Sequence, residues 1–251
     1  MKHLFSEDGE QALHALAKEN AVLAFDFDGT LSPTVPTPDQ AQMPLSICRR
    51  FEVLCKKAPV AIITGRNVED VSAKLMMLPK YLIGNHGVEG VAHQEGVLTQ
   101  YQEICEGWIN QMTSLLHHEQ MDPGFQIEHK TYSVCLHYRL VRNLGQTMKV
   151  VKDAVRQLHP SPIIIGGKCD INLLPPGAPN KRRALEHVLL LEGKQTAFYI
   201  GDDETDELVF QNAPPEWVTV RVDRVNNSAA RFFLYNQNEM AECLQRLIQA
   251  Y

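Results

Sequence analysis

The sequence has no long apolar run. None of its stretches approaches the roughly 20 residues that a membrane-spanning helix needs, so we expect no membrane partner. The first residues, Met1 to Asp8, lack the basic and apolar regions of a signal peptide. These two absences favour a cytoplasmic protein.

The chain also lacks a basic surplus. Its 24 lysine and arginine residues are outnumbered by 30 aspartate and glutamate residues, which gives a net charge of −6. Nucleic-acid-binding proteins usually carry an excess of basic residues, so we expect no nucleic-acid partner. This balance still allows a local basic pocket for a small anion.

Common metal and nucleotide motifs are missing as well. The six cysteines include no Cys-x-x-Cys pair and the ten histidines show no metal-ligand spacing, so neither a zinc site nor a disulfide framework is predicted. No Gly-x-Gly-x-x-Gly occurs. Gly166-Gly167-Lys168 is not a P-loop, because Cys169 stands where a Ser or Thr is needed.

What remains is the composition of a globular protein, with 44% hydrophobic and 22% charged residues. Short apolar runs, typical of buried strands, alternate along the chain with segments of helical periodicity. This order predicts an α/β fold with a doubly wound, mostly parallel sheet. Between about Val91 and Leu174, helices and half-polar strands predict an inserted α+β domain. We therefore expect a core domain of residues 1–90 and 175–251 and an inserted domain of residues 91–174.

The apolar run Ala21 to Phe25 ends in Asp26-Phe27-Asp28-Gly29-Thr30. It predicts a buried parallel strand whose carboxyl end, the usual place of the active site in open α/β sheets, carries two acids. Side chains two residues apart on a strand project to the same side, so Asp26 and Asp28 should face one site. A cation or a shared proton would offset their repulsion. A plain Asp-Gly turn would explain Gly29 but not the second acid.

Two further motifs suit an anion. The second buried strand ends in Thr64-Gly65-Arg66-Asn67, where a hydroxyl and the amides of a helix N-terminus can hold a phosphate oxygen. Alternatively, the asparagine merely caps the helix. Lys181 falls in the first turn of a predicted helix, where the helix dipole disfavours a cation, so an anion is expected nearby. The alternative is a basic surface that includes its two arginine neighbours.

A third buried strand, Thr196 to Ile200, ends in Gly201-Asp202-Asp203. Adjacent acids at a strand end suit a hard divalent cation with oxygen ligands. An EF-hand is excluded, because Gly29 follows Asp28 directly and does not take the sixth loop position. The candidate metal ligands are Asp26, Asp28, Asp202 and Asp203.

In their order and strand-end context, Asp26-x-Asp28-Gly29-Thr30, Thr64-Gly65-Arg66, Lys181 and Gly201-Asp202-Asp203 resemble the motif set of the haloacid dehalogenase (HAD) superfamily of phosphatases. Within it, the chain resembles the trehalose-6-phosphate phosphatase family. The motifs that carry this second resemblance are Asn85-His86-Gly87-Val88-Glu89, Glu128-x-Lys130, His137-Tyr138-Arg139, Gly167-Lys168 and Asn180-Lys181. The chain departs from the family at Asp170 and Asn172, where a glutamate is usual, and at Arg182, where a glycine is usual.

The resemblance implies an HAD-like Rossmannoid core with an inserted cap, and a Mg²⁺-dependent phosphatase of trehalose 6-phosphate. It implies that Asp26 is a nucleophile forming an aspartyl-phosphate, that Asp28 is the acid and base, and that Thr64 and Lys181 stabilise the phosphoryl oxygens. The expected substrate-binding residues are Gly65, Arg66, His86, Glu89, Glu128, Lys130, Arg139, Lys168, Asp170 and Asn172.

Other functions stay open at this point. One is a phosphatase of another sugar phosphate, such as sucrose 6-phosphate or a mannosyl- or glucosyl-glycerate phosphate. A phosphotransferase or mutase and a non-catalytic sugar-phosphate sensor are further alternatives, and the charges on the inserted sheet taken alone would indicate a solvated face. The expected partner is a small-molecule sugar phosphate, and the expected state is a monomer.

Overall fold

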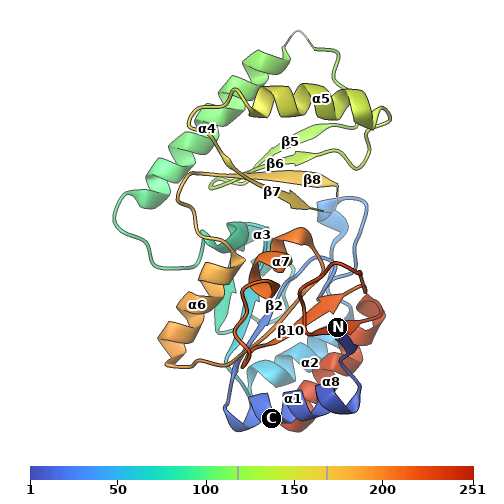
Figure 1. The fold of residues 1–251 in the computed structure, drawn as a ribbon. Coiled ribbons are helices and arrows are strands. Elements are labelled where there is room, and N and C mark those ends of the chain that lie inside the picture. Colours follow the sequence, from blue (N-terminus) through green and yellow to red (C-terminus); the bar gives the residue numbers. More distant parts are fainter. Residues whose placement is uncertain (118, 168) are drawn as a thin grey trace. The chain divides into compact units, whose positions relative to one another are not determined.

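The computed structural model describes residues 1–117, 119–167 and 169–251. It divides into two compact units (Figure 1), which we call the core unit, Met1–Val91 with Pro179–Tyr251, and the inserted unit, Ala92–Ala178. The predicted fold class, a mostly parallel α/β sheet accompanied by a separate α+β part, is confirmed. Among the described helices, none has the length and apolar character needed to span a membrane.

The core unit contains a parallel sheet with the strand order β1-β11-β10-β9-β2-β3-β4. Its strands are β1 (Lys2–His3), β2 (Val22–Phe25), β3 (Val60–Ile63), β4 (Tyr81–Ile83), β9 (Ala197–Gly201), β10 (Val218–Val222) and β11 (Phe232–Leu234). Its helices are α1 (Glu7–Lys18), α2 (Leu45–Cys55), α3 (Val68–Ala73), α6 (Lys181–Glu192), α7 (Glu204–Phe210) and α8 (Met240–Ala250), with short 3₁₀ turns at Pro38–Gln40, Asn85–Gly87 and Gln237–Glu239.

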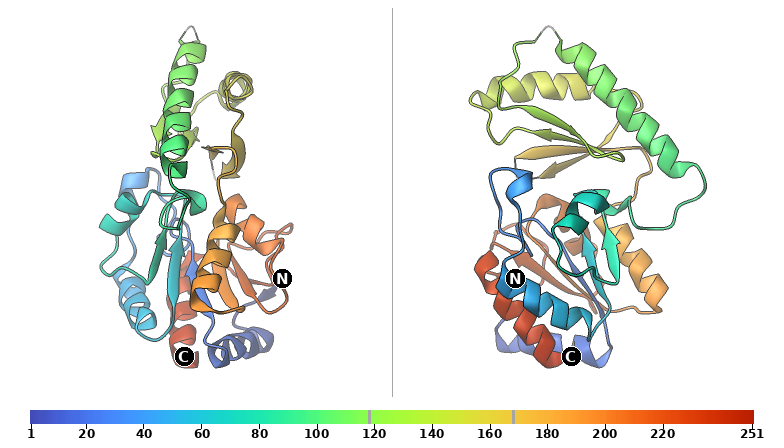
Figure 2. Two further views of the ribbon diagram at one scale, coloured as in Figure 1. Left: turned by 90° about the vertical axis from the view of Figure 1, so that its left-hand side faces the viewer. Right: turned by 180° about the vertical axis from the view of Figure 1, so that it is seen from behind.

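Helices cover both faces of this sheet (Figure 2), because alternate side chains of each strand point to opposite faces. Leu23 and Phe25 of β2 pack in one cluster with α1, α2 and α8, whereas Val22 and Ala24 pack in another with α6 and α7. Burying such a side chain stabilises the fold by roughly 1.5–3 kcal/mol. The central strand is therefore fixed from both sides.

The position of β2 locates the functional edge of the sheet. The chain runs outward from β2 to β3 and β4, and later adds β9, β10 and β11 on the other side of β2. The order thus reverses between β2 and β9, and ligands of open α/β sheets bind outside the carboxyl ends of the strands at such a point. Asp26 directly follows β2, and Asp202 directly follows β9.

The inserted unit has an antiparallel sheet with the order β5-β6-β8-β7, made of β5 (Gln126–His129), β6 (Val134–His137), β7 (Ile163–Gly167) and β8 (Asp170–Leu174). Helices α4 (Val97–Leu116) and α5 (Leu144–Val155) cover one face (Figure 2), where Trp108, Leu136 and Leu173 pack together. Side chains on the other face include Glu128, which lies opposite Cys135 of β6.

Three strands were not predicted from the sequence. β1 and β11 have two and three residues, which is too short for a periodic pattern. β8 mixes Asp170 and Asn172 with apolar residues, and its alternation becomes visible only once β6 and β7 are known to flank it.

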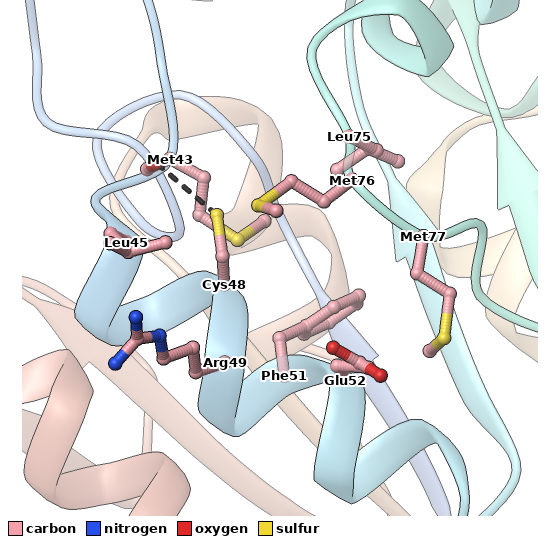
Figure 3. A pocket seen from close by; sticks show the side chains of 9 residues that line it. All are labelled: Met43, Leu45, Cys48, Arg49, Phe51, Glu52, Leu75, Met76 and Met77. Carbon is pink, nitrogen blue, oxygen red and sulfur yellow. Dashed lines mark hydrogen bonds between the residues drawn. The ribbon is translucent and has the colours of Figure 1, made fainter.

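A pocket of about 220 Å³ lies in the core unit beside α2 (Figure 3). Its lining is rich in methionine and leucine and consists of Met43, Leu45, Cys48, Arg49, Phe51, Glu52, Leu75, Met76 and Met77. None of these is an expected site residue. The pocket therefore involves none of the residues to which the sequence motifs lead.

Two helical glycines should respond to alanine with opposite signs. A Cβ on Gly9 of α1 would lie 1.8 Å from the carbonyl oxygen of Leu4, whereas one on Gly107 of α4 would meet only the Gln111 amide at 4.0 Å. We expect Gly107→Ala to raise the free energy of unfolding by about 0.5–1 kcal/mol and Gly9→Ala to lower it by about 1–3 kcal/mol, measured by urea denaturation. Stabilisation by both variants would contradict the packing described for α1.

Candidate active site

Asp26 is buried at the end of β2, with 4% of its surface exposed. Its Oδ1 accepts a hydrogen bond from Nζ of Lys181 at 2.9 Å. Lys181 is the first residue of α6, and the side chain of Asn180 caps this helix by accepting from the backbone N–H of Arg183. The anion expected beside Lys181 is thus a protein carboxylate at the switch point of the sheet.

A second carboxylate, that of Asp206, shares the same ammonium group. Lys181 Nζ donates to Asp206 Oδ1 at 2.9 Å, and the Tyr199 hydroxyl donates to that oxygen at 2.6 Å. Asp206 Oδ2 accepts from the backbone N–H groups of Asp202 and Asp203 at 3.0 and 2.9 Å. Asp206 therefore fixes both the lysine and the turn that carries Asp202.

Asp206 was not predicted as a site residue. The signal that could have found it is its place in the first turn of α7, four residues after Asp202. Gly201 is a second signal, because a Cβ there would lie 2.2 Å from Cγ of Asp206. Only a glycine allows the carboxylate to approach the backbone so closely.

Asp26, Asp202 and Asp206 form a cluster whose carboxylate oxygens lie within 4.8 Å of one another. All three are buried, and the ammonium group of Lys181 pairs with Asp26 and Asp206. Buried like charges need further compensation, and oxygen ligands in excess negative charge suit a hard divalent cation. The residues present therefore fit a divalent metal.

Gly29 supports this arrangement from the β2 side. Its φ is +75°, and a Cβ at this position would lie 2.1 Å from Oδ2 of Asp202. The glycine thus serves both the turn after β2 and the close approach of Asp202. Of the four predicted metal ligands, the described structure brings Asp26 and Asp202 into the cluster but not Asp28 or Asp203.

The pKa values in the cluster diverge. Burial raises the pKa of Asp26; the charge of Lys181 opposes this rise, and the carboxylates of Asp206 and Asp202 add to it. Burial alone would also raise the pKa of Asp206, but the charge of Lys181 and the hydrogen bonds from Tyr199, Lys181 and Asp203 lower it below its usual value. Burial alone would lower the pKa of Lys181, but the negative charges of Asp206 and Asp26 raise it above its usual value. Of these two carboxylates, Asp26 is thus the one whose negative charge needs a further cation.

Asp28 lies outside the cluster and is held by Arg66. Arg66 Nε donates to Oδ2 of Asp28 at 2.7 Å and Nη2 donates to Oδ1 at 2.8 Å. The same guanidinium also donates to the carbonyl of Pro38 at 2.8 Å and pairs with Asp70. Arg66 is 7% exposed, whereas the Asp28 side chain is 44% exposed. Arg66 therefore positions Asp28 and the 3₁₀ turn that begins at Pro38.

Asp203, the fourth predicted ligand, begins α7. Its side chain caps the helix by accepting from the backbone N–H of Glu204, and Asp203 and Asp206 together form a capping box. Such caps stabilise helices by about 1 kcal/mol.

Thr64 is buried at the end of β3, and its hydroxyl accepts from the backbone N–H of Arg66 at 3.2 Å. Gly65 lies against the imidazole of His86, since a Cβ at residue 65 would be 2.5 Å from ring atom Cε1. His86 is itself buried and adopts a φ of +59°. The loops after β3 and β4 are thus packed together at the carboxyl edge of the sheet.

Glu89 makes structural contacts in the core unit. One of its oxygens, Oε2, accepts from the backbone N–H of Val68, the first residue of α3, at 2.8 Å and from the Asn85 amide at 3.0 Å. It therefore ties the loop after β4 to the N-terminus of α3.

The other expected substrate-binding residues belong to the inserted unit. Glu128 accepts from His137 Nε2 at 2.7 Å and lies 3.6 Å from Lys130 Nζ, and the Asn172 amide donates to Asp170 Oδ1 at 2.8 Å. Arg139 follows β6. Lys168 lies outside the described residues.

Comparison with known proteins agrees with these motifs. The sequence profile described as Trehalose-phosphatase matches residues 24–240. The chain belongs to the trehalose-phosphatase family. The resemblance stated from the motifs is therefore confirmed, and the match spans both units of this trehalose-phosphatase family member.

Curated relatives in this trehalose-phosphatase family come from plants and bacteria. The chain is 27% identical to the probable trehalose-phosphate phosphatase H of Arabidopsis thaliana, over 96% of the chain and 75% of the relative. It is 31% identical to the trehalose-phosphate phosphatase of Mycobacterium ulcerans, over 94% of the chain and 65% of the relative.

Solved structures share the fold. The C-terminal domain of the C. albicans trehalose-6-phosphate phosphatase superposes with a TM-score of 0.78 at 21% identity, covering 95% of this chain and 96% of that one. A trehalose-6-phosphate phosphatase related protein gives 0.74 at 23% identity, covering 91% and 97%.

Asp206 should be as necessary as the predicted residues. Asp206→Asn keeps the shape of the side chain but leaves Lys181 with one carboxylate and places an amide group where backbone N–H groups donate. Breaking a buried ion pair costs about 3–5 kcal/mol. We therefore expect the free energy of unfolding, measured by urea denaturation, to fall by this amount. The matched variant Tyr199→Phe removes only one hydrogen bond to a charged group and should cost about 1.5–3 kcal/mol.

The loss of stability caused by Asp206→Asn should depend on pH. Because the folded-state pKa of Asp206 is depressed, its contribution is present above the usual value of 3.8 and is lost as the pH falls through the folded value. The stability difference between the wild type and Asp206→Asn should thus be constant near neutral pH and narrow below 3.8. A constant difference down to the lowest accessible pH would contradict this role.

Proposed function

We propose that this chain is a Mg²⁺-dependent phosphatase that hydrolyses trehalose 6-phosphate to trehalose and phosphate through an aspartyl-phosphate. The observation that carries the proposal is the buried Asp26, held by Lys181 at 2.9 Å beside Asp202 and Asp206. The family assignment and the names of the relatives support the substrate.

In the first step, a carboxylate oxygen of Asp26 attacks phosphorus in line with the sugar oxygen. Lys181 already donates to Oδ1 of Asp26, which leaves Oδ2 for the attack. A bond forms between Asp26 and phosphorus while the bond from phosphorus to the sugar oxygen breaks. Lys181 and the Thr64 hydroxyl stabilise the negative charge on the phosphoryl oxygens.

Asp28 supplies the proton that the departing sugar oxygen needs, and it then accepts one from the water that hydrolyses the aspartyl-phosphate. Both of its oxygens accept from Arg66, so Asp28 must give up one of these bonds to hold a proton. Its half-exposed position is consistent with proton exchange.

A divalent cation such as Mg²⁺, held by Asp26 and Asp202, would supply charge neutralisation for the phosphoryl group. Asp206 completes the described cluster, and its four hydrogen bonds favour a supporting role.

For the sugar, we propose the polar face of the inserted sheet. Glu128, Lys130, Asp170 and Asn172 offer charged and amide groups that can meet hydroxyls, and residue Asn172 is buried with an Oδ1 that has no hydrogen-bond partner among the described residues. A site built of such groups rejects analogues that lack the matching hydroxyls. The two units then have the roles of catalytic core and sugar-recognising cap.

The test is phosphate release from a panel of substrates with Mg²⁺ and with a chelator. We expect kcat/KM for trehalose 6-phosphate to exceed that for sucrose 6-phosphate, glucose 6-phosphate and glucosyl- or mannosyl-glycerate phosphates by at least about tenfold, which is about 1.4 kcal/mol. The chelator should abolish turnover, and added Mg²⁺ should restore it.

Other outcomes identify the alternatives. Preference for another member of the panel would overturn the substrate but leave the phosphatase. Transfer of the phosphoryl group to a second sugar would indicate a phosphotransferase, and binding without release would indicate a sensor.

A further inference from the structure

The inserted sheet places three different polar side chains together outside the proposed chemistry. Cys135 and His137 are two residues apart on β6, so they share one face of the sheet. Glu128 of β5 lies directly opposite Cys135 in the register. Neither Cys135 nor His137 has a place in the proposed reaction.

These three side chains form a chain of contacts. His137 Nε2 lies 2.7 Å from Oε2 of Glu128, and His137 Nδ1 lies 3.8 Å from Sγ of Cys135. Lys130 Nζ approaches the same glutamate oxygen at 3.6 Å. Since both neighbours meet Oε2, Oε1 of Glu128 is the oxygen left to accept from a ligand.

The buried thiol determines the direction of these hydrogen bonds. Burial raises the pKa of Cys135 to about 12, so it stays a thiol and can donate to Nδ1 of His137. The hydrogen bond at one ring nitrogen sets which nitrogen carries the proton. Nε2 of His137 is then the N–H that donates to Glu128.

The charge of Glu128 agrees with this direction. Burial alone would raise the pKa of Glu128, but the hydrogen bond from His137 and the charge of Lys130 lower it to about 2. The group remains a carboxylate throughout the neutral range. A carboxylate with one oxygen fixed offers the other in one orientation, which suits an acceptor for a hydroxyl.

The donor atoms of Glu128, Cys135 and His137 also lie within 4.8 Å of one another, as ligands of a metal would. The ammonium of Lys130 disfavours a cation here, because it lies 3.6 Å from Oε2 of Glu128 and already supplies a positive charge to this carboxylate. The hydrogen-bonded arrangement is therefore the one that the charges favour.

We propose that His137 is a positioning residue for sugar recognition, which fixes the Glu128 carboxylate so that Oε1 accepts a hydroxyl of the sugar phosphate. This inference rests on the proposed function, in which Glu128 binds the sugar. It assigns to His137 no contact with the phosphate and no part in bond breaking.

The experiment compares two substrates, trehalose 6-phosphate and p-nitrophenyl phosphate, which has no sugar hydroxyls. His137→Leu should raise KM for trehalose 6-phosphate about 10- to 100-fold, the range of one hydrogen bond to a charged group, with kcat changed by less than about threefold. The kcat/KM of p-nitrophenyl phosphate should stay unchanged. A fall in kcat/KM for both substrates would overturn the proposal. A fall in kcat for trehalose 6-phosphate without a rise in its KM would overturn it as well.

Two matched variants separate positioning from general damage. His137→Gln keeps an amide donor near the place of Nε2 and should recover most of the affinity. His129→Gln changes an exposed histidine at the end of β5, on the same hairpin, and should have no effect. Failure of the glutamine to improve on leucine, or an equal effect at residue 129, would contradict the assignment.

A double-mutant cycle isolates the route of the effect. In the Glu128→Ala background, His137→Leu should cause no further rise in KM, because the group that it positions is gone. If the rises in KM caused by the two substitutions are additive, the positioning role of His137 is overturned while the sugar contact of Glu128 stands. If Glu128→Ala itself leaves KM unchanged, the proposed sugar contact of Glu128 is wrong, and the present inference falls with it. Thermal unfolding of each variant verifies that the inserted unit is folded.

Discussion

The buried ammonium of Lys181, shared by Asp26 and Asp206, is the interaction on which the functional edge of this protein depends. It joins the end of β2 to the start of α6 and to the first turn of α7, two elements that lie more than 150 residues after β2 in the sequence. Removing one partner from such a pair leaves a buried charge that water cannot reach. The same contact that stabilises the edge of the sheet therefore holds the candidate nucleophile in place.

The two carboxylates are not equivalent, although both touch the same lysine. Asp206 accepts in addition from the Tyr199 hydroxyl and from two backbone N–H groups, and these bonds favour its charged form. Asp26 lacks these donors in the described contacts, and burial raises its pKa. A well-stabilised carboxylate thus lies beside a less stabilised one, and the proposed function assigns the attack on phosphorus to the latter.

The sequence predicted this edge of the sheet well and its details less well. The strand-end acids and the Thr64 motif could be predicted because a buried parallel strand is an apolar run that stops abruptly. Lys181 could be predicted because a cation is unusual in the first turn of a helix. Asp206 escaped because it follows a helix start, where an acid is equally expected as a favourable dipole partner. The partners of Asp28 and Glu89 could not be predicted either, since Arg66 and Val68 reach them only through tertiary packing. On the inserted sheet, β8 could be recognised as a strand only once its neighbours β6 and β7 were known. The contact between Glu128 and His137 likewise depends on the pairing of β5 with β6.

The most direct test of the account is to identify the residue that carries the phosphoryl group. The wild type and Asp28→Asn are mixed with trehalose 6-phosphate and Mg²⁺, quenched in acid and digested. The masses of the peptides are then measured by mass spectrometry, and Asp26→Asn serves as the control. We predict one added phosphoryl group on Asp26, accumulating in Asp28→Asn and missing in Asp26→Asn. A phosphoryl group on any other residue, or turnover by Asp26→Asn near the wild-type rate, would contradict the account.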